Sequence, residues 1–120
     1  MKEFSFEKLK VWQKSKDLSI NIYEVTAKFP NEEKFGLVSQ LRRCAVSVAS
    51  NLAEGSGRHS NKDKARFSEI AFGSLLELLN QLIISNDLYF VTDQDYKTLR
   101  NQIEEISRMI NALRKSQLNQ

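Results

Sequence analysis

The chain is poor in the residues that interrupt helices, form disulfides or ligate metals. Its 120 residues include one proline, four glycines, one cysteine and one histidine. A single cysteine excludes a disulfide framework and is typical of a reducing compartment. The N-terminus lacks the apolar run of a secretory signal, and no segment reaches 18 uninterrupted apolar residues. We therefore expect a cytoplasmic protein with no membrane partner.

What the chain does contain is apolar residues at helical spacing, three or four apart, over most of its length. No alternating strand pattern, internal repeat or low-complexity segment interrupts them. The pattern predicts one domain, residues 1–120, that is all-α and folds as an antiparallel up-down-up-down four-helix bundle. Its helices are expected at about 7–29, 32–56, 61–86 and 93–116.

Short polar residues and the single proline predict where these helices begin and end. Pro30 should end the first helix, and Gly55 and Gly57 should end the second in left-handed conformations. Asp63 adds a capping-box variant to the third helix. The predicted N-caps are Ser5, Asn31, Ser60 and Thr92.

Residues 40–81 form the centre of the predicted fold, an antiparallel hairpin of the second and third helices. Its turn at 55–60 pairs residue i with roughly 119 − i, which places Arg42 or Arg43 opposite Glu77. Asn51 should hydrogen-bond the third helix or the turn, either as part of a structural network or as part of a binding surface. Gly73 is expected where the two helices approach closely, because a helical glycine otherwise costs about 1 kcal/mol.

The third helix is apolar almost all round between residues 70 and 84. One face of a helix in a four-helix bundle always lies away from the core. An apolar outer face therefore predicts that a neighbouring subunit covers it.

The sequence offers little catalytic chemistry. Cys44 and His59 would lie roughly 20 Å apart along the bundle, so they are not expected to act as nucleophile and base. A metal site at Glu54, Glu69 and Glu77 is conceivable, but pairing of Glu54 and Glu77 with arginines is favoured. The glycines before the third helix lack the lysine motif of a phosphate loop. We predict no catalytic residues, no metal and no cofactor.

The formal net charge is +3, from 18 basic and 15 acidic residues. So small an excess admits a nucleic-acid partner without requiring one. The basic turn before the third helix is either simply solvated or able to hold a phosphate group at the helix N-terminus. The candidate nucleic-acid-binding residues are Lys8, Lys10, Lys14, Arg58, Lys62 and Lys64.

Several motifs together resemble a known bacterial family. They are LKVWQK at 9–14, Phe29-Pro30, QLRR at 40–43, SVASNLAEG at 47–55 and IAxGSxxE at 70–77. This combination is similar to the four-helix-bundle protein family, also called the ribosomal-RNA intervening-sequence protein family. The resemblance covers nearly the whole chain. Its motif positions here are Arg42, Arg43, Ser47, Asn51, Glu54, Gly55, Gly73, Ser74 and Glu77.

The resemblance implies a ring-like homopentamer of four-helix protomers. It also implies kinship with the accessory protein of diversity-generating retroelements, a basic pentamer that binds nucleic acid and a reverse transcriptase. The leading hypothesis is therefore a non-enzymatic oligomer that binds RNA or DNA as a scaffold or chaperone-like accessory. The alternative is a protein-interaction adaptor without nucleic-acid affinity. A helical-bundle ribonuclease is disfavoured, because His59 is the only histidine and adjoins Arg58.

Overall fold

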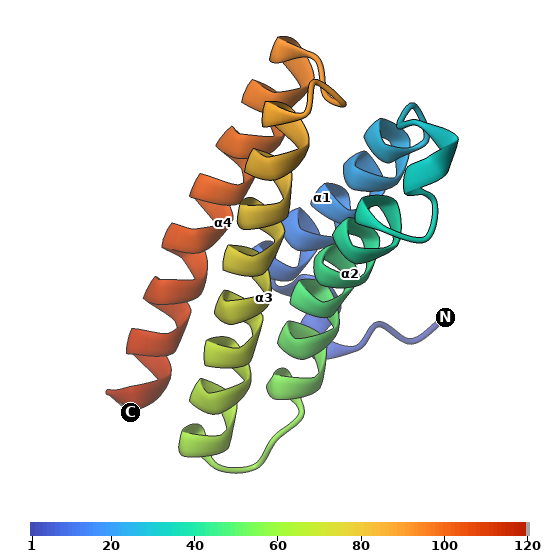
Figure 1. Cartoon of the computed structure of the whole chain (residues 1–120). Coiled ribbons are helices and arrows are strands. Elements are labelled where there is room, and N and C mark those ends of the chain that lie inside the picture. The colour runs from blue at the N-terminus through green and yellow to red at the C-terminus, as the bar shows by residue number, and fades with distance from the viewer. Residues whose placement is uncertain (120) are drawn as a thin grey trace.

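The computed structural model describes residues 1–119 as four long helices packed around one apolar core (Figure 1). The helices run antiparallel in chain order, and the bundle measures 45 × 32 × 22 Å. Each packs against its neighbours along the chain, and α1 also contacts α4, which closes the bundle. The long helices are α1 (Lys10–Thr26), α2 (Leu37–Ser56), α3 (Asn61–Asp87) and α4 (Asp93–Leu118). The predicted up-down-up-down four-helix bundle is confirmed.

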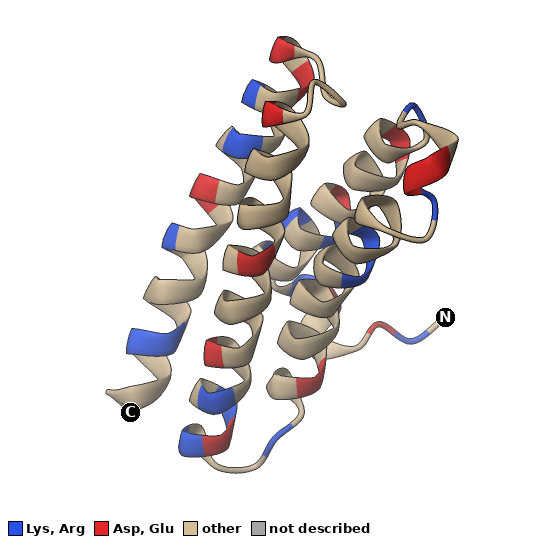
Figure 2. Cartoon of the chain, in the orientation of Figure 1, with Lys and Arg blue, Asp and Glu red and all other residues tan. Residues whose placement is uncertain are grey.

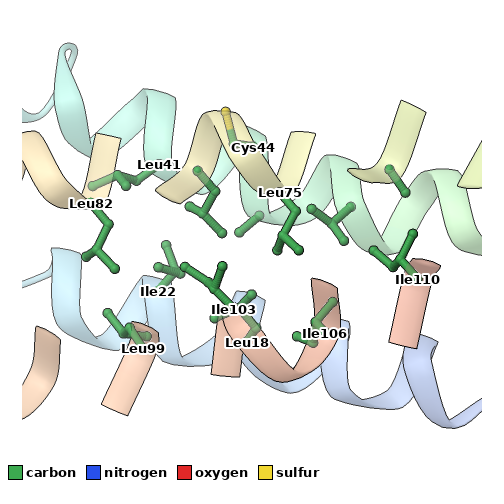
Figure 3. Packing of buried hydrophobic residues seen from close by; sticks show 14 of the residues in the cluster. Leu18, Ile22, Leu41, Cys44, Leu75, Leu82, Leu99, Ile103, Ile106 and Ile110 are labelled. Atoms are coloured by element: carbon green, nitrogen blue, oxygen red, sulfur yellow. The ribbon is translucent and has the colours of Figure 1, made fainter. Parts of the chain in front are cut away.

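The core forms where the apolar stripes of the four helices meet (Figure 3). The stripe of α1 includes Leu18 and Ile22, and that of α4 includes Ile103, Ile106 and Ile110; all are at most 1% exposed. Removing such side chains from water is the main stabilising contribution to a bundle of this size. The spacing of three and four residues in the sequence was therefore sufficient to predict which face of each helix is buried.

The start of the first helix was predicted wrongly. Residues Ser5–Lys8 form a separate 3-10 turn, η1, and extended backbone at Leu9 precedes α1. Ser5 therefore does not cap α1, which begins at Lys10 rather than at Glu7. The break directs Phe6 back against Trp12, with ring centroids 4.9 Å apart. This aromatic contact replaces the first helical turn expected from the sequence.

The connection between the first two helices is also longer than predicted. The first helix ends at Thr26, three residues before the expected end, and Phe29 turns inward to pack on Phe90. Residues Asn31–Glu33 form a second 3-10 turn, η2, and α2 begins only at Leu37. Asn31 makes no capping hydrogen bond, so it is not the N-cap of α2. Burial of Phe29 outweighs the local preference for a helix that starts directly after the proline.

The other two predicted N-caps are confirmed. Ser60 Oγ accepts a hydrogen bond from the Asp63 amide at 3.1 Å at the start of α3. Thr92 Oγ1 accepts one from the Asp95 amide at 3.1 Å at the start of α4. The bounds of α3 and α4 lie within two residues of those predicted. Where a side chain satisfies the orphan amides locally, the sequence alone locates the helix start.

The two glycines before the turn act differently from the prediction. Among residues 1–119, no glycine has a positive φ. Gly55 lies inside α2, and a Cβ built on it would be 2.6 Å from the Cβ of Phe67. Gly55 is thus needed for close approach of α2 to α3, which is the role the sequence analysis gave to Gly73.

Candidate nucleic-acid interface

The seam between α2 and α3 holds most of the motif residues. Arg43 Nη2 contacts Glu77 Oε2 at 2.6 Å, which confirms the predicted arginine–glutamate pair. The Cys44 thiol donates a hydrogen bond to the same carboxylate oxygen at 3.1 Å. The hydrogen bond from Cys44 and then the one from Arg43 lower the pKa of the Glu77 carboxyl below its ordinary range. Burial and the adjacent carboxylate raise the pKa of the Cys44 thiol to about 11, so this cysteine is a protonated donor and not a nucleophile.

Further along the same seam, a small polar pair joins the helices. Ser47 Oγ and Ser74 Oγ lie 2.9 Å apart. Asn51 was expected to bond α3 or the turn, and this prediction is wrong. Its amide donates instead to the Ser47 carbonyl at 2.8 Å and to Ser47 Oγ at 3.1 Å, within its own helix. In the structure, the residue numbers of facing positions on α2 and α3 sum to about 121, two more than the predicted 119. This shift moves Asn51 away from the partner expected on α3.

Arg42 faces the other way, toward α1. Its Nε donates to Thr26 Oγ1 at 2.9 Å, and its guanidinium lies over the Tyr23 ring, 4.4 Å from the centroid. It also donates to the Tyr23 carbonyl at 3.3 Å, near the end of α1, where this carbonyl also accepts a hydrogen bond from the Ala27 amide. Adjacent arginines therefore connect α2 to two different helices, α3 through Arg43 and α1 through Arg42.

Arg58, one of the predicted nucleic-acid-binding residues, lies at the end of the hairpin and binds within the protomer. Arg58 contacts Glu54 Oε2 at 2.8 Å and lies 4.4 Å from the centroid of the Phe67 ring. Glu54 therefore pairs with an arginine, as expected. Arg58 is held over Phe67 by contacts within the protomer, so its charge is partly neutralised where a phosphate would bind.

At one end of the bundle, basic residues from α1, α3, α4 and the adjoining turns outnumber acidic ones by eight to four over residues 7–10, 54–69 and 114–118 (Figure 2). We call it the basic end; here α1 and α3 begin while α2 and α4 end. Leu9, Ser56, Lys64 and Leu113 line one shallow hollow there, which shows that the four termini adjoin. The basic residues of this end are Lys8, Lys10, Arg58, Lys62, Lys64, Arg66, Arg114 and Lys115.

Four of the six candidate residues carry charges at this end that no carboxylate among residues 1–119 pairs within 4.0 Å. Lys8, Lys10 and Lys62 are exposed and Lys64 is half-buried. Lys14 lies farther along α1 and contacts Glu105 at 3.2 Å, so the structure separates it from this group. Lys8, Lys10, Lys62 and Lys64 thus define the candidate surface.

The opposite end of the bundle is acidic. Over residues 28–34 and 87–97 together, acidic residues outnumber basic ones by five to three, and Lys28 contacts Asp95 at 3.1 Å. The small net charge of the chain therefore conceals a separation of charge along the bundle axis. The acidic residues of this end are Glu32, Glu33, Asp87, Asp93 and Asp95.

No group of three or more His, Cys, Asp or Glu side chains within residues 1–119 is arranged to hold a metal ion. His59 is exposed in the turn and Cys44 is buried in the middle of α2. The two side chains that the sequence analysis considered as a catalytic pair are therefore in different environments.

The outer face of α3 carries apolar side chains that the protomer leaves uncovered. Ile70, Leu76, Ile83 and Ile84 are between 36% and 49% exposed. By length and composition, α3 is the one helix among the described residues that is apolar enough to cross a membrane, and only 28% of its most apolar window is buried. Gly73 lies on this face, and a Cβ built on it would meet no atom within 4 Å. The predicted close approach of α2 at Gly73 is therefore wrong.

A second apolar surface was missed by the sequence analysis. A hollow of about 610 Å³ lies between α1 and α2, lined almost entirely by apolar atoms. Ile20, Tyr23 and Val46 contribute to it and are 43–51% exposed. The available signal was that these apolar residues fall off the core stripes of their helices.

Four antiparallel helices around a single core define a four-helix-bundle protein with a basic end and two exposed apolar surfaces. Residues 7–112 match the family of 23S rRNA-intervening sequence proteins, and the chain belongs to this family. The fold is similar to the crystal structure of a protein with unknown function from the S23 ribosomal protein family from Bacteroides thetaiotaomicron. That likeness has a TM-score of 0.79 at 21% identity and covers 88% of this chain and 98% of the other. No curated protein matches the chain.

Proposed function

We propose that the protein is a non-enzymatic, cytoplasmic homo-oligomer that binds RNA or DNA through its basic end. The observation that carries the proposal is the separation of charge along the bundle (Figure 2). Within residues 1–119, Lys8, Lys10, Lys62 and Lys64 contact no carboxylate at the end where all four helices terminate. Phosphate neutralisation by such lysines, with release of counterions, is the source of sequence-independent affinity for nucleic acid.

Assembly would turn a weakly basic protomer into a strongly basic surface. If the symmetry axis of a ring runs parallel to the bundle axes, the basic ends of all protomers lie on the same face of the ring. Five protomers at +3 each would carry about +15 in total. A strand that touches several protomers gains avidity without any new kind of contact. A pentamer of this kind could also hold a nucleic-acid enzyme, such as a polymerase, close to its template.

Fluorescence anisotropy with generic single-stranded RNA and DNA tests the proposal. We expect sequence-tolerant binding whose log–log dependence on salt has a slope of roughly −0.7 to −0.9 per phosphate contacted. Replacing Lys10 and Lys62 by glutamate should flatten this slope. The matched control replaces Lys34 and Lys97 by glutamate; both are exposed near the acidic end. Absence of binding at about 50 mM salt, or equal effects of both double variants, would contradict the proposed surface.

The exposed apolar surfaces favour a second candidate function, that of a protein-interaction adaptor without nucleic-acid affinity. The two functions differ in the role of charge. An adaptor would bind its protein partner with little dependence on salt and would show no anisotropy change with RNA or DNA. The salt titration above therefore also separates these two functions.

A further inference from the structure

The two exposed apolar surfaces of the protomer have different shapes. The outer face of α3 is convex, because one helix presents Ile70, Leu76, Ile83 and Ile84 along its length. The surface between α1 and α2 is a hollow of about 610 Å³ with Phe6, Trp12, Ile20 and Val46 in its lining. We call the first the ridge and the second the groove. Apolar patches of this kind are uncommon on proteins that remain monomeric.

The ridge and the groove also lie on different sides of the bundle. The backbone of α1 packs beside those of α2 and α4 but not beside that of α3, so α1 and α3 occupy opposite corners (Figure 1). The groove is built on α1, whereas the ridge is built on α3. A protomer therefore cannot cover its own ridge with its own groove, and two such surfaces can meet only between copies.

The two surfaces lie at the same height along the bundle axis. Ser19 Oγ donates to the Ala45 carbonyl at 3.0 Å, so the middle of α1 is level with the middle of α2. Ser47 Oγ lies 2.9 Å from Ser74 Oγ, so this level continues onto α3. Rotation about an axis that runs along the bundle preserves height. It would bring the groove of one copy against the middle of the ridge of the next.

At this level, the groove and the ridge also complement each other in charge and in the space available for packing. Lys16 is in the lining of the groove, one turn before Ile20, and its nearest carboxylate partner is Asp17 at a distant 3.9 Å. The corresponding level on α3 is Gly73. Glu77, one turn after it, is already held by Arg43, whereas Glu69, one turn before it, is 64% exposed and makes only a longer contact of 3.6 Å with Arg114. The open space at Gly73 would let a neighbouring copy approach the α3 backbone closely.

We propose that the ridge of one protomer packs into the groove of the next, head to tail, with Lys16 facing the exposed Glu69 carboxylate beside Gly73. This inference rests on the proposed oligomer and specifies its interface. A contact between two different surfaces is heterologous, so repetition builds a closed ring when the rotation closes. Each copy then presents its basic end on the same side.

Two single variants that each block one surface test the pairing directly. Leu76→Glu blocks the ridge, and Val46→Glu blocks the groove; both side chains are more than 40% exposed, so the fold should tolerate the changes. Each variant alone should have the mass of one chain, 13.9 kDa, by light scattering. A mixture should form a 1:1 dimer and nothing larger, because one intact ridge and one intact groove remain.

The matched control is Phe35→Glu, an 89% exposed aromatic that belongs to neither surface, and it should leave the assembly unchanged. Circular dichroism confirms that each variant is folded. If wild-type protein is a monomer at micromolar concentration, the proposed oligomer itself is wrong. If wild type assembles but either single variant assembles equally well, that surface is not in the interface. If both variants are monomeric and do not pair when mixed, the head-to-tail contact is wrong, although the oligomer stands.

Discussion

At the scale of single residues, Gly55 and Gly73 show how little the residue type reveals about its role. Both occur in long helices of the central hairpin, and glycine costs about 1 kcal/mol relative to alanine in either place. Gly55 is buried and its α-carbon faces the Cβ of Phe67, whereas Gly73 is exposed and faces open space in the protomer. Gly55 is therefore explained by packing within the chain, and Gly73 is not.

We predict opposite effects of alanine at these two positions. Gly55→Ala should lower the free energy of unfolding by about 1–3 kcal/mol, because a Cβ 2.6 Å from that of Phe67 forces the two backbones apart. Gly73→Ala should raise it by up to about 1 kcal/mol through helix propensity. Urea unfolding of both variants in the Leu76→Glu background measures the effect on the protomer. Equal effects would show that the α2–α3 packing is looser than described.

A second residue-scale prediction concerns the Arg43–Glu77 pair. The pKa of Glu77 is lowered in the folded state, chiefly by its hydrogen bonds from Cys44 and Arg43. Its contribution to stability is therefore present above the pKa of the unfolded chain and is lost as pH falls through the folded pKa. Both side chains are about half exposed, so we expect at most about 1 kcal/mol at pH 7.

A double-mutant cycle with Arg43→Gln and Glu77→Gln isolates this pair. The coupling energy from thermal or urea unfolding should be positive at pH 7 and should diminish as acid protonates Glu77, at a pH below the ordinary range of a glutamate carboxyl. A coupling energy that does not change between pH 7 and pH 3 would mean that packing, not charge, connects the two residues.

At the scale of elements, the end of α3 shows a backbone conformation that its residue disfavours. Tyr89 has a φ of 63°, the one positive value among non-glycine residues of the described chain. The Phe90 amide bonds the Ser85 carbonyl and the Tyr89 amide bonds the Asn86 carbonyl, both at 3.0 Å. These two bonds form a Schellman motif, in which glycine is the usual residue at the position of Tyr89.

We predict that Tyr89→Gly stabilises the protein. The left-handed conformation costs a non-glycine residue roughly 1–2 kcal/mol, and part of this gain is offset by the greater freedom of glycine in the unfolded chain. The tyrosine side chain is 93% exposed, so its loss removes little packing. The net expectation is an increase of up to about 1 kcal/mol in the free energy of unfolding. Leu88→Gly, at a residue with negative φ, is the control and should destabilise.

At the scale of the whole molecule, the uncovered ridge and groove predict that stability depends on protein concentration. Anything that binds the folded protomer stabilises it, and here the partner is another copy. The melting temperature of wild-type protein should rise with concentration, since each tenfold increase favours an association step by roughly 1.4 kcal/mol. Scanning calorimetry over a hundredfold concentration range measures this. The melting temperature of the Leu76→Glu variant should not change with protein concentration. A wild-type melting temperature that is also independent of concentration would contradict assembly.

The amino-acid pattern by itself determined the fold class, the four helices and their buried faces, because these depend on the periodicity of apolar residues along one helix at a time. It also located the Ser60 and Thr92 caps and the Arg43–Glu77 pair, which depend on short distances along the chain or across one hairpin. The tertiary structure alone decided what Asn51, Gly55 and Gly73 do. A shift of two residues in helix pairing, which no local pattern encodes, removes the α3 partner expected for Asn51. The separation of charge between the two ends and the groove between α1 and α2 likewise arise only when distant helices are brought together.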